Sequence, residues 1–388
     1  MNKNIPDIRF KGFTEEWEEC ELSQLVDLQS GRDYKHLLNG HIPVYGTGGY
    51  MLSVNEALSY KEDAVGIGRK GTIDKPYILN APFWTVDTLF YSLPKGKNNL
   101  NFIYDIFQKI NWRQKDESTG VPSLSKVAIN GIKIFTTTPK EQTKIGNYFK
   151  TLDQLITQQQ QKYDKLISIK KAMLKKMFPQ NGANVPEIRF KGFTEDWVEK
   201  EFNKMCWFQE GPGLRNWQFT NQGIKVINIT NLENGFLNLE RTDRHISLKE
   251  FNKMYQHFEI DEQDIVVASS GNSYGKVAVV RKQDLPLLMN TSVIRFKPFK
   301  GLDYEYLLNF LKSNQFKNQI DLLITGGAQP NFGPVHLNKI KISLPSNINE
   351  QIKIGSYFKN LYSLISLYEK EIEKLKNIKK AFLDKMFV

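Results

Sequence analysis

The sequence lacks the residue patterns on which most enzyme sites depend. Only two of its 388 residues are cysteines, Cys20 and Cys206, and no C-x-x-C pair occurs, so neither a disulfide framework nor a zinc site is expected. The five histidines are scattered without metal-ligand spacing. The P-loop pattern G-x-x-x-x-G-K-[ST] and the Glu-x-Lys element of many metal-dependent nucleases are also missing. We therefore predict no catalytic residue, no metal site and no cofactor in this chain.

Long hydrophobic runs are absent as well. No window approaches about 18 uninterrupted apolar residues, and the start MNKNIPDIRF does not resemble a signal peptide, so we expect a cytoplasmic protein without a membrane partner. Basic residues outnumber acidic ones by 53 to 42, which gives a net charge of +11. This surplus favours a polyanionic partner such as nucleic acid, although a merely basic soluble protein would carry the same charge.

The sequence contains two internal repeats. The motif PDIRFKGFTEEW at 6–17 returns as PEIRFKGFTEDW at 186–197, and segment 141–178 returns at 350–387 with 21 of 38 positions identical. The blocks between the repeats differ, but VPSLSKVAINGIKI (121–134) weakly matches QPNFGPVHLNKIKI (329–342). This order predicts one fold built twice with divergent surfaces, as in a protein that does one job on two targets.

Each repeated long segment is predicted to be a helix that pairs with the other copy. Apolar residues recur at alternating spacings of four and three, which is typical of a coiled coil. In the first segment they are Ile145, Phe149, Leu152, Ile156, Tyr163, Leu166 and Met173; in the second they are Ile354, Phe358, Leu361, Ile365, Tyr368, Ile372, Leu375 and Phe382. Two separate amphipathic helices, each lying on its own domain, are the alternative.

The two differing blocks are predicted to be mixed α/β. Short β-rich runs bounded by turn residues recur in both, and short helices are expected at 100–111 and 303–321. NAPF at 80–83 resembles the loop with which adenine amino-methyltransferases hold a flipped base. However, Ala81 replaces a proline of that loop, and no glycine-rich turn is present to seat a methyl donor. A built-in methyltransferase is therefore not favoured.

Polar, glycine-rich loops are the candidate DNA-binding segments. GIGRKGTI (66–73) and DESTGVPSLSK (116–126) in the first block correspond to SSGNSYGKV (269–277) and ITGGAQPNFG (324–333) in the second. Glycines let a backbone approach phosphates, and Arg, Lys, Asn and Gln side chains read base edges. Each loop taken singly is also compatible with an ordinary hairpin turn, and the matching positions in both blocks strengthen the functional interpretation of the set. The candidate residues are Thr47, Arg69, Lys70, Thr72, Ser118, Thr119, Ser123, Lys126, Arg215, Asn216, Ser270, Asn272, Ser273, Lys276, Gln329 and Asn331.

The order of repeats carries a family resemblance. Two divergent blocks, each followed by EQ-x-KIG-x-YF and K-x-x-x-IKKA-x-L-x-KMF and each preceded by P-x-IRFKGFTE-x-W, resemble the specificity subunit of Type I restriction–modification enzymes. The resemblance covers essentially the whole chain. It implies an α/β (α+β) fold with two pseudo-repeated target-recognition domains separated by two long antiparallel coiled-coil helices. The corresponding ranges are domain 1 at 1–140, spacer helix 1 at 141–178, connector and domain 2 at 179–349, and spacer helix 2 at 350–388.

The resemblance also implies a function and a set of partners. Such a subunit is not an enzyme itself: it binds double-stranded DNA and reads a bipartite, asymmetric site, one half per domain. It assembles with two methyltransferase subunits, on which S-adenosylmethionine is expected, and with a restriction/translocase subunit. Two alternatives stay open from the residues alone. One is a self-contained DNA methyltransferase or nuclease, and the other is a coiled-coil scaffold that binds DNA without sequence preference.

Overall fold

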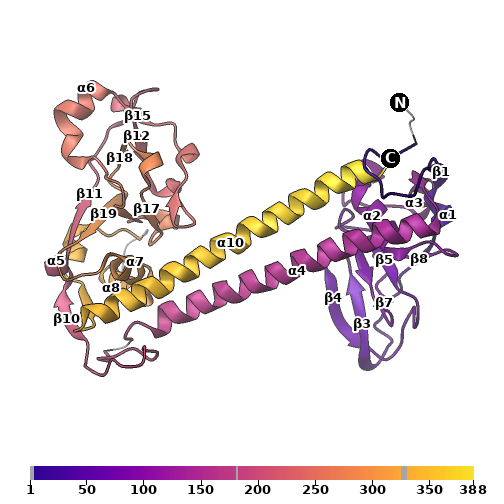
Figure 1. Cartoon of the computed structure of the whole chain (residues 1–388), viewed down its shortest axis with the longest axis horizontal. Helices are drawn as coiled ribbons and strands as arrows, with labels where there is room; N and C mark the ends of the chain where they lie inside the picture. Colours follow the sequence, from indigo (N-terminus) through magenta and orange to yellow (C-terminus); the bar gives the residue numbers. More distant parts are fainter. Residues whose placement is uncertain (1–3, 181, 325–329) are drawn as a thin grey trace. The chain divides into compact units, whose positions relative to one another are not determined.

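The computed structural model describes residues 4–180, 182–324 and 330–388. The chain divides into two compact units (Figure 1). Unit 1 comprises Met1–Lys162 and Tyr368–Val388, and unit 2 comprises Tyr163–Leu367. Each unit therefore contains one of the differing blocks together with a segment of each long helix. The mixed α/β fold class predicted from the sequence is confirmed.

Unit 1 is built on a four-stranded sheet, a three-stranded sheet and a short two-stranded ribbon. The four-stranded sheet has the order β2-β8-β5-β6, the three-stranded sheet β4-β3-β7, and the ribbon β1-β9. The elements are β1 (Glu18–Glu21), α1 (Leu22–Leu25), β2 (Val26–Ser30), β3 (Asn39–Gly46), β4 (Gly49–Val54), β5 (Ala64–Gly68), β6 (Tyr77–Leu79), β7 (Trp84–Thr85), β8 (Leu89–Pro94), α2 (Leu100–Lys109), α3 (Lys126–Asn130), β9 (Lys133–Thr136) and the start of α4 (Pro139–Lys176).

Unit 2 repeats this topology. Its sheets have the orders β11-β19-β16-β17, β15-β12-β18 and β10-β20, and a small β13-β14 hairpin is added. The elements are β10 (Val198–Glu201), α5 (Phe202–Met205), β11 (Cys206–Glu210), β12 (Ile224–Ile227), β13 (Leu232–Glu233), β14 (Phe236–Leu237), β15 (His245–Ile246), α6 (Leu248–Glu250), β16 (Ile265–Ala268), β17 (Val277–Val279), β18 (Leu287–Met289), β19 (Val293–Pro298), α7 (Tyr304–Lys312), α8 (Asn314–Leu323), α9 (Pro334–Leu337), β20 (Lys341–Leu344) and α10 (Ile348–Met386).

The pairing pattern shows that the two blocks share one fold. In both units the four-stranded sheet is antiparallel, and the three-stranded sheet contains one parallel pair, β3 with β7 and β12 with β18. The central strands β5 and β16 are buried along their whole length, which explains their continuous apolar runs AVGIG and IVVA. The same fold thus forms from two sequences that share few residues between the repeats.

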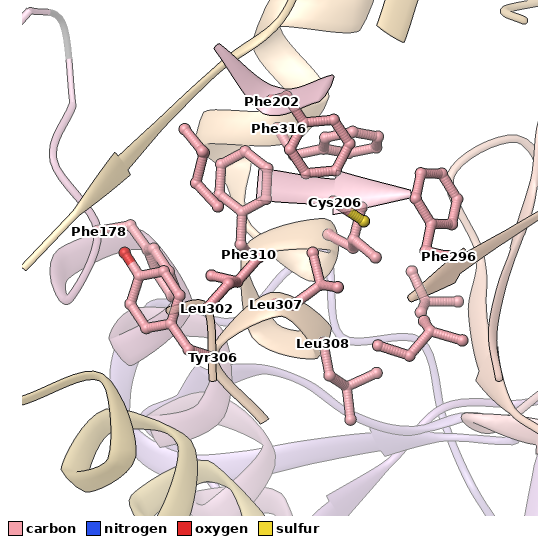
Figure 2. Packing of buried hydrophobic residues seen from close by; sticks show 14 of the residues in the cluster. Phe178, Phe202, Cys206, Phe296, Leu302, Tyr306, Leu307, Leu308, Phe310 and Phe316 are labelled. Carbon is pink, nitrogen blue, oxygen red and sulfur yellow. The ribbon is translucent and has the colours of Figure 1, made fainter. Parts of the chain in front are cut away.

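Short helices cover the four-stranded sheets. Asn99 and Asp303 cap α2 and α7 by accepting a hydrogen bond from the backbone N–H of the third helical residue. The single helix predicted at 303–321 is instead two helices, because Ser313 ends α7 and its hydroxyl then caps α8. In unit 2 these helices bury aromatic rings against the sheet, including Phe310, Phe316 and Phe202 (Figure 2).

In each unit, α4 and α10 lie side by side and antiparallel (Figure 1). In unit 1, Phe149 packs on Phe387 and Asp153 accepts a hydrogen bond from Lys379 at 2.5 Å. In unit 2, Lys170 lies over the ring of Tyr362. As residue numbers rise along α4, the partner numbers on α10 fall, which defines the antiparallel direction. The apolar stripe residues are buried or half-buried: Ile145, Phe149, Leu152, Ile156, Tyr163, Leu166, Met173, Ile354, Phe358, Leu361, Ile365, Tyr368, Ile372, Leu375 and Phe382.

The repeated motif at 6–17 and 186–197 fastens each block to the helix pair. Arg9 donates two hydrogen bonds to the fully buried carboxylate of Glu141, at 2.7 and 2.8 Å. Arg189 does the same to Glu350, at 2.6 and 2.8 Å. The hydrogen bonds with Glu141 raise the pKa of Arg9. This buried ion pair gives the motif a structural role. Such a role agrees with the nearly identical sequence of the motif in two otherwise divergent halves.

The long helices are not apolar enough for a bilayer. Among the helices within the described residues, none combines the length and the low charge that a membrane span requires.

Candidate nucleic-acid interface

One end of the four-stranded sheet in unit 1 gathers loops from four parts of the chain. The chain leaves β2 at Gly31, whose N–H donates to the carbonyl of Leu89 at 3.0 Å. A Cβ at Gly31 would lie 2.0 Å from the carbonyl oxygen of Val86, so only glycine fits there. The turn after β7 continues to Thr88, whose carbonyl accepts from the N–H of Arg69 at 2.8 Å. These contacts place the segments after β2, β5 and β7 side by side.

The two glycine-rich loops predicted from the sequence lie next to each other at this sheet end. Gly71 donates to the carbonyl of Pro122 at 2.8 Å, and Leu124 donates to the carbonyl of Arg69 at 2.9 Å. Lys70 and Ser123 form the bridge between them. Gly71 has a φ of +84°, which a residue with a side chain adopts only with strain. The structure therefore brings Arg69, Lys70 and Ser123 together.

Unit 2 builds the same loop cluster with the same hydrogen bonds. Gly271 donates to Pro330 at 3.1 Å and Phe332 donates to Ser269 at 3.0 Å. Ser270 and Asn331 form the bridge that Lys70 and Ser123 form in unit 1. Gly211 approaches the carbonyl oxygen of Asn290 as Gly31 approaches that of Val86. A Cβ added at Gly211 would lie 2.2 Å from the Asn290 oxygen. We call these equivalent assemblies the loop clusters of units 1 and 2: residues 31–33, 69–72, 85–88 and 116–126, and residues 211–213, 269–273, 290–292 and 330–333.

The side chains on the two loop clusters differ in chemistry although the backbones agree. Arg69 and Lys70 are exposed cations in unit 1, whereas Ser269 and Ser270 occupy the equivalent places in unit 2. The guanidinium of Arg69 reaches the carbonyl of Asp87 at 3.4 Å and lies over the ring of Phe90. These contacts hold the exposed guanidinium in one orientation. Exposed donors on a rigid loop can bind phosphates or base edges.

A carboxylate that belongs to the second loop of unit 1 holds this loop together. Asp116 accepts hydrogen bonds from the N–H of Ser123 at 2.9 Å and from the N–H and hydroxyl of Ser118 at 3.0 and 2.8 Å. These bonds lower the pKa of Asp116, those from Ser123 and Ser118 backbone N–H most of all. Ser118 is therefore committed to holding the loop, while Thr119 beside it is exposed. Lys126 follows as the first residue of α3 and is half-buried, and Thr72 is half-buried as well.

The remaining predicted residues lie in or beside the loop clusters, or outside the described residues. Thr47 lies in the turn between β3 and β4, beside segment 85–88 of the unit 1 loop cluster, because Val86 donates to the carbonyl of Tyr45 at 3.0 Å. Ser273 ends the short 3₁₀ turn after Ser270 and accepts from the N–H of Lys276. Asn272 belongs to the same 3₁₀ turn, Gly271–Ser273, and Gln329 lies outside the described residues.

A lysine-rich surface pocket lies beside the unit 2 cluster. Its volume is about 200 Å³, and it is lined by Tyr274, Gly275, Lys276, Leu311, Lys312, Ser313, Phe316 and Lys317. Burial lowers the pKa of Lys312 to about 8, with a further contribution from neighbouring Lys170. Lys276 and Lys317 are exposed, so the pocket presents cations suited to a phosphate.

Arg215 and Asn216 lie on a loop of unit 2 that has a counterpart in unit 1. Segment 211–223 corresponds to 31–40, because a Cβ at Gly223 would meet the carbonyl oxygen of Ile246 as a Cβ at Gly40 would meet that of Val54. The unit 2 loop is only three residues longer. Sequence reasoning also missed Trp217, whose side chain is 80% exposed at the tip of this loop. A tryptophan inside a polar, turn-rich segment was the available signal.

Across the part of the chain that the structure describes, no group of three or more His, Cys, Asp or Glu side chains is placed to hold a metal ion. The two cysteines are unpaired, and burial raises the pKa of Cys206 far above its usual range.

Comparison with known proteins identifies the family. Residues 14–167 and 194–377 both match the Type I restriction modification DNA specificity domain. The two matches cover most of the chain and fall on units that repeat one topology. The chain therefore belongs to the family of Type I restriction–modification specificity subunits, the DNA-recognition components of those systems.

Individual relatives agree with this assignment. The chain is 26% identical over 329 residues to the MjaVIII specificity subunit of Methanocaldococcus jannaschii, which covers 82% of this chain and 74% of that protein. It is 27% identical over 161 residues to the StySPI specificity subunit of Salmonella potsdam, over 41% of this chain and 34% of that protein.

Solved structures share the fold. The S subunit of a Type I restriction–modification system from M. genitalium superposes with a TM-score of 0.68 at 15% identity, covering 99% of both chains. A chain from work on complex assembly and conformational transition of the type I R-M system matches with a TM-score of 0.54 at 12% identity, covering 95% of this chain and 97% of that one.

Proposed function

We propose that this chain is the non-catalytic specificity subunit of a Type I restriction–modification enzyme and reads a bipartite, asymmetric DNA site. Unit 1 would read one half-site and unit 2 the other, each through its loop cluster. The observation that carries the proposal is that both loop clusters rest on the same backbone hydrogen bonds but present different side chains, as at Lys70 and Ser270. The same backbone scaffold with different side chains suits a protein whose two units bind different half-sites.

The positive charge supports DNA as the partner. The chain has a net charge of +11, and exposed cations such as Arg69, Lys70 and Lys276 border the loop clusters. Contacts of these cations with phosphates would give salt-dependent affinity, and polar side chains on the loops would supply sequence choice.

Two methyltransferase subunits are the proposed protein partners, together with a restriction/translocase subunit. A partner present in two copies should use surfaces that are alike in both units. Leu155 and Leu364 occupy the same place on α4 and α10 and are 40% and 45% exposed. Val127 and Val335, on α3 and α9, are 83% and 69% exposed. S-adenosylmethionine would bind to the methyltransferase subunits, which would carry out the methyl transfer.

Mapping methylated adenines tests the reading function. The chain is co-expressed with a Type I methyltransferase subunit that co-purifies with it, and modified DNA is sequenced for methylated positions. We expect one two-part motif, and we expect exchange of residues 18–140 for another recognition block to change one half of it only. Simultaneous change of both halves would contradict independent reading.

The chain purified without partners separates the alternatives. Methyl transfer or cleavage by the purified chain alone would identify a self-contained enzyme. DNA binding that no competitor sequence distinguishes would identify a scaffold without sequence choice. For the protein partners, the double variant L155E/L364E is expected to lose most of the co-purifying methyltransferase while keeping its thermal unfolding profile.

A further inference from the structure

The loops after β2 and β11 form a matched pair with a common construction. Loop 31–40 and loop 211–223 both begin at a glycine pressed against the turn that follows β7 or β18, and both end at a glycine pressed against a neighbouring strand carbonyl. Gly31 and Gly211 belong to the loop clusters already described. Each loop therefore starts at the proposed DNA-reading end of its sheet. We call them the tip loops.

The tip loop of unit 2 presents an exposed indole on a fixed backbone. Trp217 is 80% exposed, whereas the next residue, Gln218, is 6% exposed. The Gln218 side chain accepts from the N–H of Arg215 at 2.7 Å, donates to the hydroxyl of Tyr255 at 2.9 Å, and also donates to Glu250. Because the anchor lies one residue away, the ring projects from a short, rigid 3₁₀ turn.

The tip loop of unit 1 presents a smaller apolar side chain in the same manner. Leu38 is 72% exposed. Its N–H donates to the side chain of Asn55 at 3.0 Å, and its carbonyl accepts from the N–H of Asn55 at 3.0 Å. Leu37 beside it packs into the cluster around Trp84. One residue of each tip loop is thus anchored while its neighbour points into solvent.

The surroundings of Trp217 favour DNA over a protein partner. Arg215 and Asn216, immediately before it, are exposed and carry the donors that pair with guanine and adenine edges. A methyltransferase used twice should meet like residues in both units, but the tip loops differ in length and in residue type. A surface that differs between the units fits the component that also differs, which is the half-site.

We propose that Trp217 and Leu38 are base-contacting side chains, Trp217 by stacking against a base step of the half-site read by unit 2 and Leu38 by apolar contact in the half-site read by unit 1. The inference rests on the proposed function and adds residues to it. Apolar side chains inserted at base steps unstack DNA locally, and aromatic stacking on a base is worth about 1–3 kcal/mol by alanine substitution, or roughly 5- to 150-fold in affinity.

Methylation by the assembled complex tests the assignment. W217A, W217F and L38A chains are each prepared with the methyltransferase subunits, and rates are measured on DNA with the mapped site and on DNA altered in one half. W217A is expected to lower the rate at limiting DNA by roughly tenfold and W217F by less. L38A is expected to relax discrimination in the other half-site only.

Tryptophan fluorescence gives a second readout. Of the six tryptophans, all of which the structure describes, Trp217 alone is exposed. Wild-type minus W217F emission therefore isolates this ring, and we expect site-containing DNA to quench it and DNA lacking that half-site to quench it less.

Unchanged rates, unchanged site choice and no DNA-dependent quenching in the W217A and W217F complexes would overturn the inference. Loss of methyltransferase from the W217A chain would also overturn it and would assign Trp217 to a protein contact. A wild-type complex without site-specific methylation would instead overturn the proposed function, so the two failures are distinguishable.

Discussion

The two units use different polar groups at a place where they share the same geometry. At the junction between the short helix and the long helices, unit 1 has Asp105 on α2, with Asp153 on α4 and Lys379 on α10. Lys379 also donates to Gln108 at 2.7 Å. The Asp153–Lys379 ion pair therefore holds this junction in unit 1.

Unit 2 holds the same junction with neutral groups and two cations. Asn309 occupies the place of Asp105 and accepts a hydrogen bond from the hydroxyl of Tyr362 at 3.0 Å. Lys170 and Lys312 lie over the Tyr362 ring at 5.6 and 4.3 Å. The units thus keep one shape at this junction while different polar groups achieve the fit.

Other contacts are the same in both units. The Arg9–Glu141 and Arg189–Glu350 ion pairs are equivalent, and so are Gly146 and Gly355, which lie where α4 and α10 meet the caps of α2 and α7. These shared contacts and the differing junction can be tested against each other by exchanging residues between the units.

Removing one partner of a shared ion pair should have the largest effect. R9A leaves the buried Glu141 without its guanidinium, and R189A does the same to Glu350, so each is expected to destabilise its own unit by about 3–5 kcal/mol. Hydrogen exchange measured by mass spectrometry on the full chain reports which unit opens. The double variant R9M/E141L, which removes both charges, should recover most of the loss. Equal exchange in both units after R9A would contradict the assignment of this ion pair to unit 1.

Adding a methyl group at the shared glycines should have a smaller effect. A Cβ at Gly146 would lie 2.4 Å from the Asn99 side-chain oxygen and 2.7 Å from the backbone nitrogen of Phe102, so G146A is expected to cost about 1–3 kcal/mol. G355A should act similarly on unit 2. G48A is the control, because no atom lies within 4 Å of its added methyl group. If the G146A chain had the same melting temperature as G48A, the junction would be able to accommodate the added methyl group without loss of stability.

Transplanting the unit 2 residue into unit 1 should change a pH dependence. Burial, opposed by Lys379, raises the pKa of Asp105 well above its ordinary value. The folded state therefore holds a proton that the unfolded state has released, and unit 1 should lose stability as pH rises from about 4 towards neutrality. D105N should remove this slope while keeping the shape. A slope that persists in D105N, measured by thermal unfolding from pH 4 to 7, would assign it to other groups.

The reverse transplant should have the smallest effect. Burial lowers the pKa of Lys312 to about 8, so wild-type unit 2 should gain stability between pH 8 and about 10.5 as the unfolded chain alone keeps the proton. K312Q installs the residue that unit 1 has at Gln108 and should flatten this rise, with a gain of about 1 kcal/mol at pH 7 after allowance for solvent screening. K317Q, at an exposed lysine of the same pocket, is the control and should keep the rise.

The sequence predicted those parts of the fold that the internal repeats encode. Identity between 141–178 and 350–387 and the spacing of residues such as Phe149 and Phe358 indicated the paired helices, because a long apolar stripe needs a partner to bury it. The weak match of Pro122 with Pro330 also predicted that the glycine-rich loops are equivalent. In the structure both prolines accept the same backbone hydrogen bond.

Other features were beyond sequence reasoning for physical reasons. The equivalence of loops 31–40 and 211–223 depends on glycines that meet strand carbonyls, and those contacts are defined only once the sheets have formed. The break between α7 and α8 was missed because the apolar pattern continues through Ser313, whose hydroxyl begins a new helix. Which loop residues contact bases stays a prediction.

The packing of Phe387 has a consequence for the order in which the chain folds. Phe387, from the segment after α10, stacks on Phe102 and meets Trp17 edge-on in the core of unit 1. Unit 2 is continuous in sequence, so all of its core is available before residue 387 is synthesised. The core of unit 1 stays incomplete until Phe387 is synthesised, and its completion closes a loop of several hundred residues. Closing such a loop costs only slightly more entropy than closing a short one, but it delays the folding of unit 1. On the ribosome, the later-encoded unit should therefore finish first.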